Sequence, residues 1–157
     1  MRKSVKEVTE LIISRSNPGV EITKDMEQKI AGIGKKYKLR LAVIYGSYAK
    51  DKSHKASDLD IAVLGKKELD FKTVLELYSE FSDVFRGKEI DIKSLHRVDP
   101  FFRYQVMRDS ILIYGEPLEY HNFKAYAFRA YMDSRDLLRL EQIMSQKTIS
   151  YLRESHA

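Results

Sequence analysis

The stretch Tyr45-Gly46-Ser47-Tyr48-Ala49-Lys50, followed by Ser57-Asp58-Leu59-Asp60, decides the fold of this chain. A continuous apolar run, Leu41 to Tyr45, leads into Gly46 and is typical of a strand buried on both faces. A Gly-Ser pair between a strand and a helical turn exposes backbone N–H groups and a hydroxyl, which suit phosphate oxygens. Taken alone, such a pair is more often an ordinary turn.

The two aspartates that follow are a second signal. Ten residues separate Ser47 from Asp58, and Asp58 and Asp60 stand two apart at the start of the apolar strand Leu59 to Leu64. Because strand side chains alternate between faces, both carboxylates project to one side, with Cα atoms ~7 Å apart. Leu59 and Ile61 face the core, so the acids belong to the other face or to its exposed end. A hard divalent cation relieves the repulsion between two such carboxylates. An isolated Asp-x-Asp is also common in a simple turn.

A third acid lies further along the chain. Asp91 stands between Ile90 and Ile92 in a segment that alternates polar and apolar residues. This strand could lie beside the strand of Asp58 and Asp60. The alternative is that Asp91 faces solvent, as a lone acid in a half-exposed strand does.

Outward from this region, strands alternate with helices. We predict strands over 41–45, 59–64, 89–95 and 111–114, and helices over 23–37, 71–85, 99–109 and from about 122 onward, with a break near Ser134. Gly32 and Gly34 count against the first of these helices. The alternation predicts an α/β or α+β layered domain. We assign residues 1–22 to an N-terminal helical extension, 23–117 to the core domain and 118–157 to a C-terminal helical segment.

Composition narrows the class of protein. The 157 residues include 43% hydrophobic residues, enough for a core, and no cysteine, so disulfides and thiolate chemistry are excluded. No stretch approaches the ~20 apolar residues of a membrane span. We therefore expect a cytoplasmic protein without a membrane partner. The formal charge of +5 fits a phosphate-rich partner and a solvated basic surface equally, and direct nucleic-acid binding is not expected.

The whole arrangement resembles a known family. Gly46-Ser47, the spacing to Asp58-Leu59-Asp60, and an acid on the third strand are similar to the signature of the minimal nucleotidyltransferases of the DNA-polymerase-β-like superfamily. The resemblance covers roughly Lys38 to Gly115. It implies a nucleotidyltransferase fold, in which a small mixed β-sheet is flanked by helices, here with an N-terminal helical extension and a long C-terminal helix.

The resemblance also implies roles for individual residues. Asp58, Asp60 and Asp91 would be catalytic and would hold one or two Mg²⁺ ions, with Asp91 as the acceptor of the attacking hydroxyl's proton. ATP would be the substrate, and the nucleotide-binding residues would be Gly46, Ser47, Lys50 and Ser57. The family usually has Arg where this chain has Lys50, and a lysine lacks the planar fork that grips phosphate in two places.

The segment from Phe123 to Asp133 is similar to the tail of the antitoxin half of HEPN–MNT toxin–antitoxin pairs. That resemblance implies an enzyme that transfers AMP from ATP to a hydroxyl, a tyrosine of a HEPN toxin partner. Two alternatives remain: a small-molecule adenylyltransferase of the aminoglycoside type, and a catalytically silent antitoxin that neutralises its partner by binding. Five tail aromatics either pack on the domain or form a contact surface for the toxin: Tyr120, Phe123, Tyr126, Phe128 and Tyr131.

Overall fold

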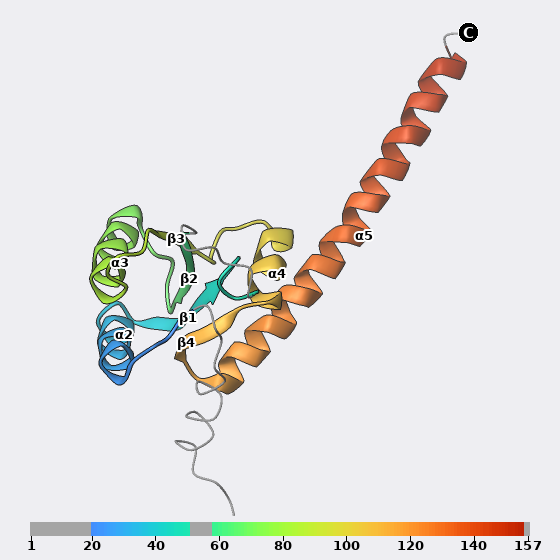
Figure 1. The fold of residues 1–157 in the computed structure, drawn as a ribbon. Coiled ribbons are helices and arrows are strands. Elements are labelled where there is room, and N and C mark those ends of the chain that lie inside the picture. The colour runs from blue at the N-terminus through green and yellow to red at the C-terminus, as the bar shows by residue number, and fades with distance from the viewer. Residues whose placement is uncertain (1–19, 51–57, 156–157) are drawn as a thin grey trace, which may run out of the picture.

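The computed structural model describes residues 20–50 and 58–155. The elements in chain order are α2 (Lys24–Lys36), β1 (Leu39–Tyr45), β2 (Leu59–Gly65), α3 (Phe71–Val84), β3 (Ile90–Ser94), α4 (Pro100–Arg108), β4 (Ile111–Gly115) and α5 (Pro117–Ser155) (Figure 1). Residues 1–19 of the predicted N-terminal helical extension and Ser57 lie outside the described residues, and residues 20–22 are not helical. Within those residues, no helix combines the length and the apolar character needed to cross a membrane.

The four strands form one mixed sheet in the order β3-β2-β1-β4. β1 pairs antiparallel with both β2 and β4, whereas β2 and β3 run parallel. Helix α3 makes the crossover between the two parallel strands. Helices α2 and α3 cover one face of the sheet, and α4 and the first turns of α5 cover the other (Figure 1). The prediction of a small mixed sheet flanked by helices is confirmed.

Helix α2 forms despite its two glycines. Thr23 caps it, and its side-chain oxygen accepts a hydrogen bond from the Met26 N–H at 3.4 Å. Gly34 is buried, and the ring of Tyr114 on β4 occupies the space that a Cβ at this position would need. The glycine that counted against the helix is therefore a packing requirement between α2 and β4. Gly32 is exposed, and a Cβ there would meet nothing within 4 Å.

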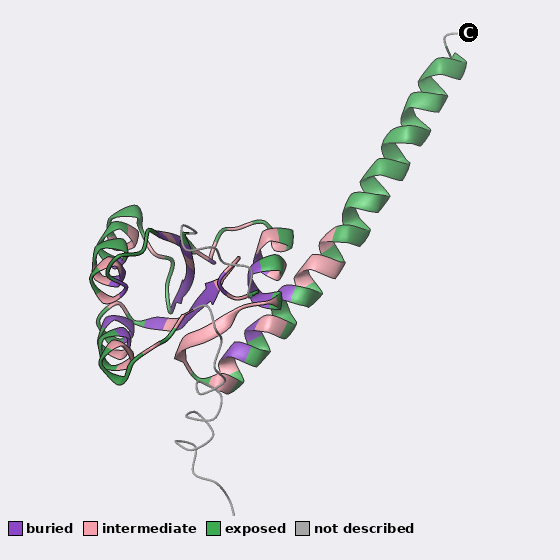
Figure 2. Cartoon of the chain, viewed as in Figure 1, coloured by how far each residue is buried: buried purple, intermediate pink, exposed green. Residues whose placement is uncertain are grey.

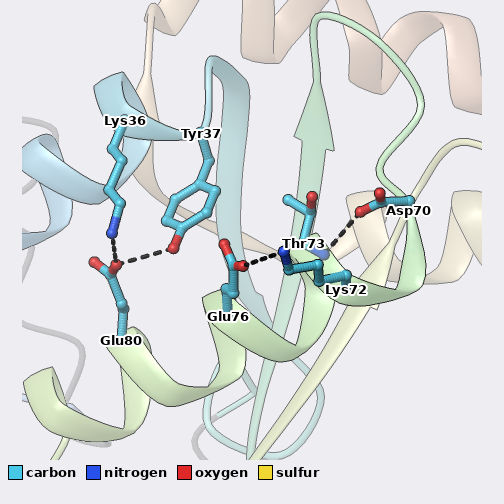
Figure 3. Close-up of polar contacts among 7 residues, drawn as sticks. All are labelled: Lys36, Tyr37, Asp70, Lys72, Thr73, Glu76 and Glu80. Atoms are coloured by element: carbon cyan, nitrogen blue, oxygen red, sulfur yellow. Dashed lines mark hydrogen bonds and ion pairs between the residues drawn. The ribbon is translucent and has the colours of Figure 1, made fainter.

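Polar contacts join α2 to α3 on the same side of the sheet (Figure 3). The Glu80 carboxylate accepts hydrogen bonds from the Lys36 ammonium and, at 2.9 Å, from the Tyr37 hydroxyl. At the start of α3, the Asp70 carboxylate accepts from the Thr73 N–H at 2.8 Å and so caps the helix. We call the contacts of Glu80 with Lys36 and Tyr37 the α2–α3 clamp. It lies at the surface of the first core, which is the hydrophobic cluster between the sheet and helices α2 and α3. The second core is the cluster on the opposite face, between the sheet and helices α4 and α5.

The long C-terminal helix differs from its prediction in two ways. It begins at Pro117 rather than near 122, because proline suits the first turn of a helix, where no N–H is needed. It is also unbroken at Ser134, whose hydroxyl donates to the Tyr131 carbonyl at 2.8 Å and so adds a hydrogen bond within the helix. Its buried residues are Tyr120, Phe123 and Ala127, all near its start. Every described residue from 135 onward is exposed, and this part extends away from the domain (Figure 2).

Candidate active site

The candidate site lies where β1 ends and β2 begins. Tyr45, the last residue of β1, is paired with Asp60 on β2, and Asp60 is paired with Asp91 on β3. Paired residues on neighbouring strands have side chains on the same face of a sheet. The register therefore places the Tyr45 ring and two carboxylates in one row across three strands. The prediction that Asp91 lies on a strand beside that of Asp60 is confirmed.

This row lies on the sheet face that α4 and α5 cover. Leu59 and Ile61 are buried in the first core, so Asp60 between them faces the opposite way, as do Ala62 and Leu64 in the second core. The second core stops short of the carboxylates, since Asp60 and Asp91 are only partly buried. Asp58 precedes β2 and is exposed. The acids thus stand at the open end of a face that is otherwise covered.

The electrostatics show that these groups affect one another. Burial raises the pKa of Asp60, and the negative charges of Asp91 and Asp58 raise it further, whereas the Lys93 ammonium lowers it. Burial also raises the pKa of the Tyr45 hydroxyl, with Asp60 and Asp91 as further causes. Three carboxylates with a shared field favour the approach of a cation.

The backbone at Gly46 lies directly against the Asp60 carboxylate. Gly46 has a φ of +74°, and a Cβ built on it would stand 3.2 Å from Asp60 Cγ and would overlap Oδ2. The turn continues through Ser47, whose carbonyl accepts from the Lys50 N–H at 3.3 Å. The predicted phosphate-binding turn and the predicted metal ligand are therefore immediate neighbours.

Lys50 contacts Asp109, a residue that the sequence does not indicate as its partner. Its Nζ lies 3.4 Å from Asp109 Oδ2, at the end of α4, and the same oxygen accepts from Nε and Nη2 of Arg108, both at 2.8 Å. The Arg108 guanidinium, with Lys50 as a lesser contributor, lowers the pKa of Asp109. No spacing rule links position 50 to position 109. The contact follows from the pairing of β4 with β1, which brings Ile111 opposite Ile44.

The donor set fits a hard divalent cation in kind, because Asp60 and Asp91 offer carboxylate oxygens from adjacent strands. It is not a ready-made cage. Over residues 20–50 and 58–155, no three acidic or histidine side chains gather closely enough to hold a metal ion. Lys93, a second residue missed from sequence, lies with Nζ 3.3 Å from Asp91 Oδ2. The structure thus brings together Asp60, Asp91 and Gly46, leaves Asp58 exposed beside them, and turns Lys50 toward Asp109.

A cavity of about 800 Å³ lies elsewhere, next to Leu64, His96 and Phe123, at the far end of β2. Arg103 lines it, and its guanidinium donates to the backbone carbonyls of Leu95, His96 and Val98. None of the predicted site residues that the structure describes lines this cavity. It is separate from the acidic row.

Comparisons with known proteins identify the family and the fold. Residues 28–118 match the family described as polymerase beta, nucleotidyltransferase. The chain is 30% identical over 90 residues to MJ0435 of Methanocaldococcus jannaschii, covering 55% of this chain and 92% of that protein. It is 31% identical over 77 residues to MJ1547 of the same organism, covering 49% of this chain and 57% of that protein. Both relatives are named as candidate protein adenylyltransferases.

Solved structures share the fold. A chain of a toxin–antitoxin crystal structure with AMP-PNP superposes with a TM-score of 0.61 at 24% identity, covering 75% of this chain and 98% of that one. A chain of the complex of tri-AMPylated Shewanella oneidensis HEPN toxin with MNT antitoxin gives a TM-score of 0.56 at 22% identity, covering 77% and 98%. At such identities the likeness concerns the fold alone.

Proposed function

The chain belongs to the polymerase β nucleotidyltransferase family, and on this premise we propose that it is a metal-dependent adenylyltransferase. It transfers AMP from ATP to a hydroxyl group of a partner protein. The observation that carries the proposal is the row of Asp60 and Asp91, with the Gly46 backbone against the Asp60 carboxylate. The names of the two archaeal relatives point to a protein acceptor rather than a small molecule.

The partner in this proposal is a HEPN-type toxin, and the acceptor is a tyrosine hydroxyl. Two structures of this fold are toxin–antitoxin complexes, one with an ATP analogue and one in which the HEPN toxin carries AMP groups. The chain would therefore act as the antitoxin of a pair. The aminoglycoside-type alternative draws no support from the relatives.

The reaction has a simple balance. The acceptor oxygen forms a bond to the α-phosphorus of ATP, the bond from that phosphorus to the bridging oxygen breaks, and pyrophosphate leaves. Asp58, Asp60 and Asp91 would hold Mg²⁺, which when bound neutralises charge on the triphosphate. The Gly46 and Ser47 turn offers N–H and hydroxyl donors to the β- and γ-phosphates. Asp91 accepts the proton of the attacking hydroxyl.

The test is transfer from labelled ATP to a co-encoded HEPN toxin in the presence of Mg²⁺, with the modified residue found by mass spectrometry. We expect one or more AMP groups on a toxin tyrosine. Asp60→Asn and Asp91→Ala abolish transfer and leave the fold intact, whereas the control Asp83→Asn, at an exposed site on α3, transfers normally. Full transfer by Asp60→Asn removes the metal-ligand assignment. Toxin neutralisation without any AMP transfer would instead identify a silent antitoxin.

Melting temperatures give a second test without substrate. Asp60→Asn removes one of three neighbouring negative charges, so the metal-free variant should melt higher than the wild type. Mg²⁺ with ATP should raise the wild-type melting temperature by very roughly 5–10 °C at a hundredfold excess over Kd, and the variant should lose most of this response. Equal shifts in both proteins would make Asp60 an ordinary surface residue.

A further inference from the structure

Lys93 occupies a particular place in the acidic row. It stands two residues after Asp91 on β3, so its side chain lies on the same face of the sheet as the carboxylates. Its neighbour in register on β2 is Ala62, which is fully buried and small. The aliphatic part of the Lys93 side chain therefore lies next to a small apolar residue on the same face of the sheet. Its Nζ lies 3.3 Å from Asp91 Oδ2.

The consequence concerns the availability of Asp91. One of its two oxygens lies beside an ammonium group, and that group carries the same sign of charge as a divalent cation. Both partners are about half exposed, with side-chain exposures of 51% for Lys93 and 46% for Asp91, so the contact can open without unpacking the core.

We propose that Lys93 is an internal counter-ion, which holds Asp91 in the metal-free chain and competes with a divalent cation for that carboxylate. The proposal rests on the metal site of the proposed function. This role predicts two effects of opposite direction when Lys93 is replaced, which an ordinary surface lysine would not show. Removing the ammonium should weaken the metal-free fold, because it unmasks repulsion among the acids, and should tighten cation binding. At roughly 6 Å in water, a unit charge opposes a divalent ion enough to change its affinity about tenfold.

The experiment measures Mn²⁺ binding to the full-length, nucleotide-free chain by electron paramagnetic resonance, together with the metal-free melting temperature. Lys93→Gln should bind Mn²⁺ about three- to tenfold more tightly than the wild type and should melt lower without metal. Lys93→Arg keeps the charge and should behave as the wild type. The matched control is Lys72→Gln on α3, which removes an exposed lysine paired with Glu76 (Figure 3). Helix α3 covers the opposite face of the sheet from the acidic row.

A double-mutant cycle isolates the pair. The fold-change in Mn²⁺ affinity that Lys93→Gln causes should be at least three times smaller in an Asp91→Asn background than in the wild-type background. Equal or weaker Mn²⁺ binding by Lys93→Gln overturns the inference and leaves the proposed activity untouched, since transfer is assayed separately. Absence of Mn²⁺ binding in both the wild type and Lys93→Gln overturns the inference together with the metal site.

Discussion

The Asp60 carboxylate fills the space in which a side chain at Gly46 would begin. The positive φ of +74° at Gly46 ends β1 and turns the chain toward Ser47 at the point where Asp60 stands across from Tyr45. One glycine therefore satisfies two requirements, a left-handed backbone and a close approach to an acid. Any larger residue must displace either the turn or the carboxylate.

Gly46→Ala should abolish AMP transfer and lower the melting temperature, because the added methyl group collides with Asp60 Oδ2. The backbone strain alone costs ~1–2 kcal/mol. Gly87→Ala is the matched control, since Gly87 has a φ of +81° and a Cβ there would meet nothing within 4 Å. It should show a similar strain and full activity. Equal activity of the two variants in the transfer assay would contradict the role given to the Gly46–Asp60 contact.

The two glycines of α2 should respond in opposite directions to alanine. Gly32→Ala adds a helix-favouring residue at an exposed site and should stabilise the fold by ~0.5–1 kcal/mol. Gly34→Ala places a methyl group in the Tyr114 ring and should destabilise by ~1–3 kcal/mol. Urea unfolding of both variants measures this. A stabilising Gly34→Ala would mean that the ring of Tyr114 moves aside at no cost.

The strands and the acidic row could be predicted from sequence because their signals are local. Apolar runs marked β1 and β2, and the alternation around Asp91 marked β3. The strand–helix–strand order then made the parallel pairing with Asp60 the natural arrangement. The Lys93–Asp91 contact was also within reach, since residues two apart on a strand share a face.

Other features depended on contacts between distant segments. The sequence around Gly34 does not predict that the Tyr114 ring will cover it. The sequence around Lys50 does not predict its ion pair with Asp109. The start of α5 differs from its prediction for another reason. The segment Gly115-Glu116-Pro117 is typical of a turn that ends a strand, but a proline also suits the first turn of the helix that follows.

The α2–α3 clamp predicts a pH dependence. The hydrogen bond from Lys36 lowers the pKa of Glu80 below its ordinary 4.5, and Glu80 raises the pKa of Lys36 above 10.5. A carboxyl group whose pKa is lowered in the folded state stabilises the fold above its unfolded-state pKa. This stability is lost as the pH falls through its folded-state pKa. An amine whose pKa is raised in the folded state stabilises the fold below its unfolded-state pKa. This stability is lost as the pH rises through its folded-state pKa. The contribution should therefore be full between about pH 5 and pH 10.

Glu80→Gln tests this dependence. At pH 7 the variant should melt about 1–3 °C below the wild type, because surface ion pairs contribute little. The difference should shrink toward zero as the pH falls through the pKa of Glu80, which the Lys36 ammonium lowers below its ordinary 4.5. Thermal unfolding followed by circular dichroism from pH 3 to pH 9 gives the curve. A difference that stays constant across this range would show that the glutamate acts by packing rather than by charge.

The C-terminal part of α5 should be dispensable for folding and needed for binding the toxin partner of the proposed function. Its last buried residue is Ala127, so a deletion of residues 135–157 removes, among the described residues, only exposed ones. Eight large apolar side chains are exposed among the described residues from 135 onward, and four of them stand at spacings of three, four and seven, which place them along one stripe: Leu137, Leu140, Met144 and Tyr151. Such a stripe on a projecting helix offers apolar area that the domain itself does not use.

The deletion should therefore leave the melting temperature within about 2 °C of the wild type, as expected for surface changes, and weaken binding of the HEPN toxin at least tenfold. A deletion after Asn122 is a poorer test, since it removes Phe123 and Ala127 from the second core and should unfold the chain. The matched control is the pair Phe71→Ser and Leu75→Ser, which removes exposed apolar side chains from α3. Calorimetric titration with the toxin measures the difference. If the shortened chain binds the toxin as tightly as the full chain, the partner contacts the body of the domain, and the exposed aromatic residues Tyr126 and Phe128 become the surface to test next.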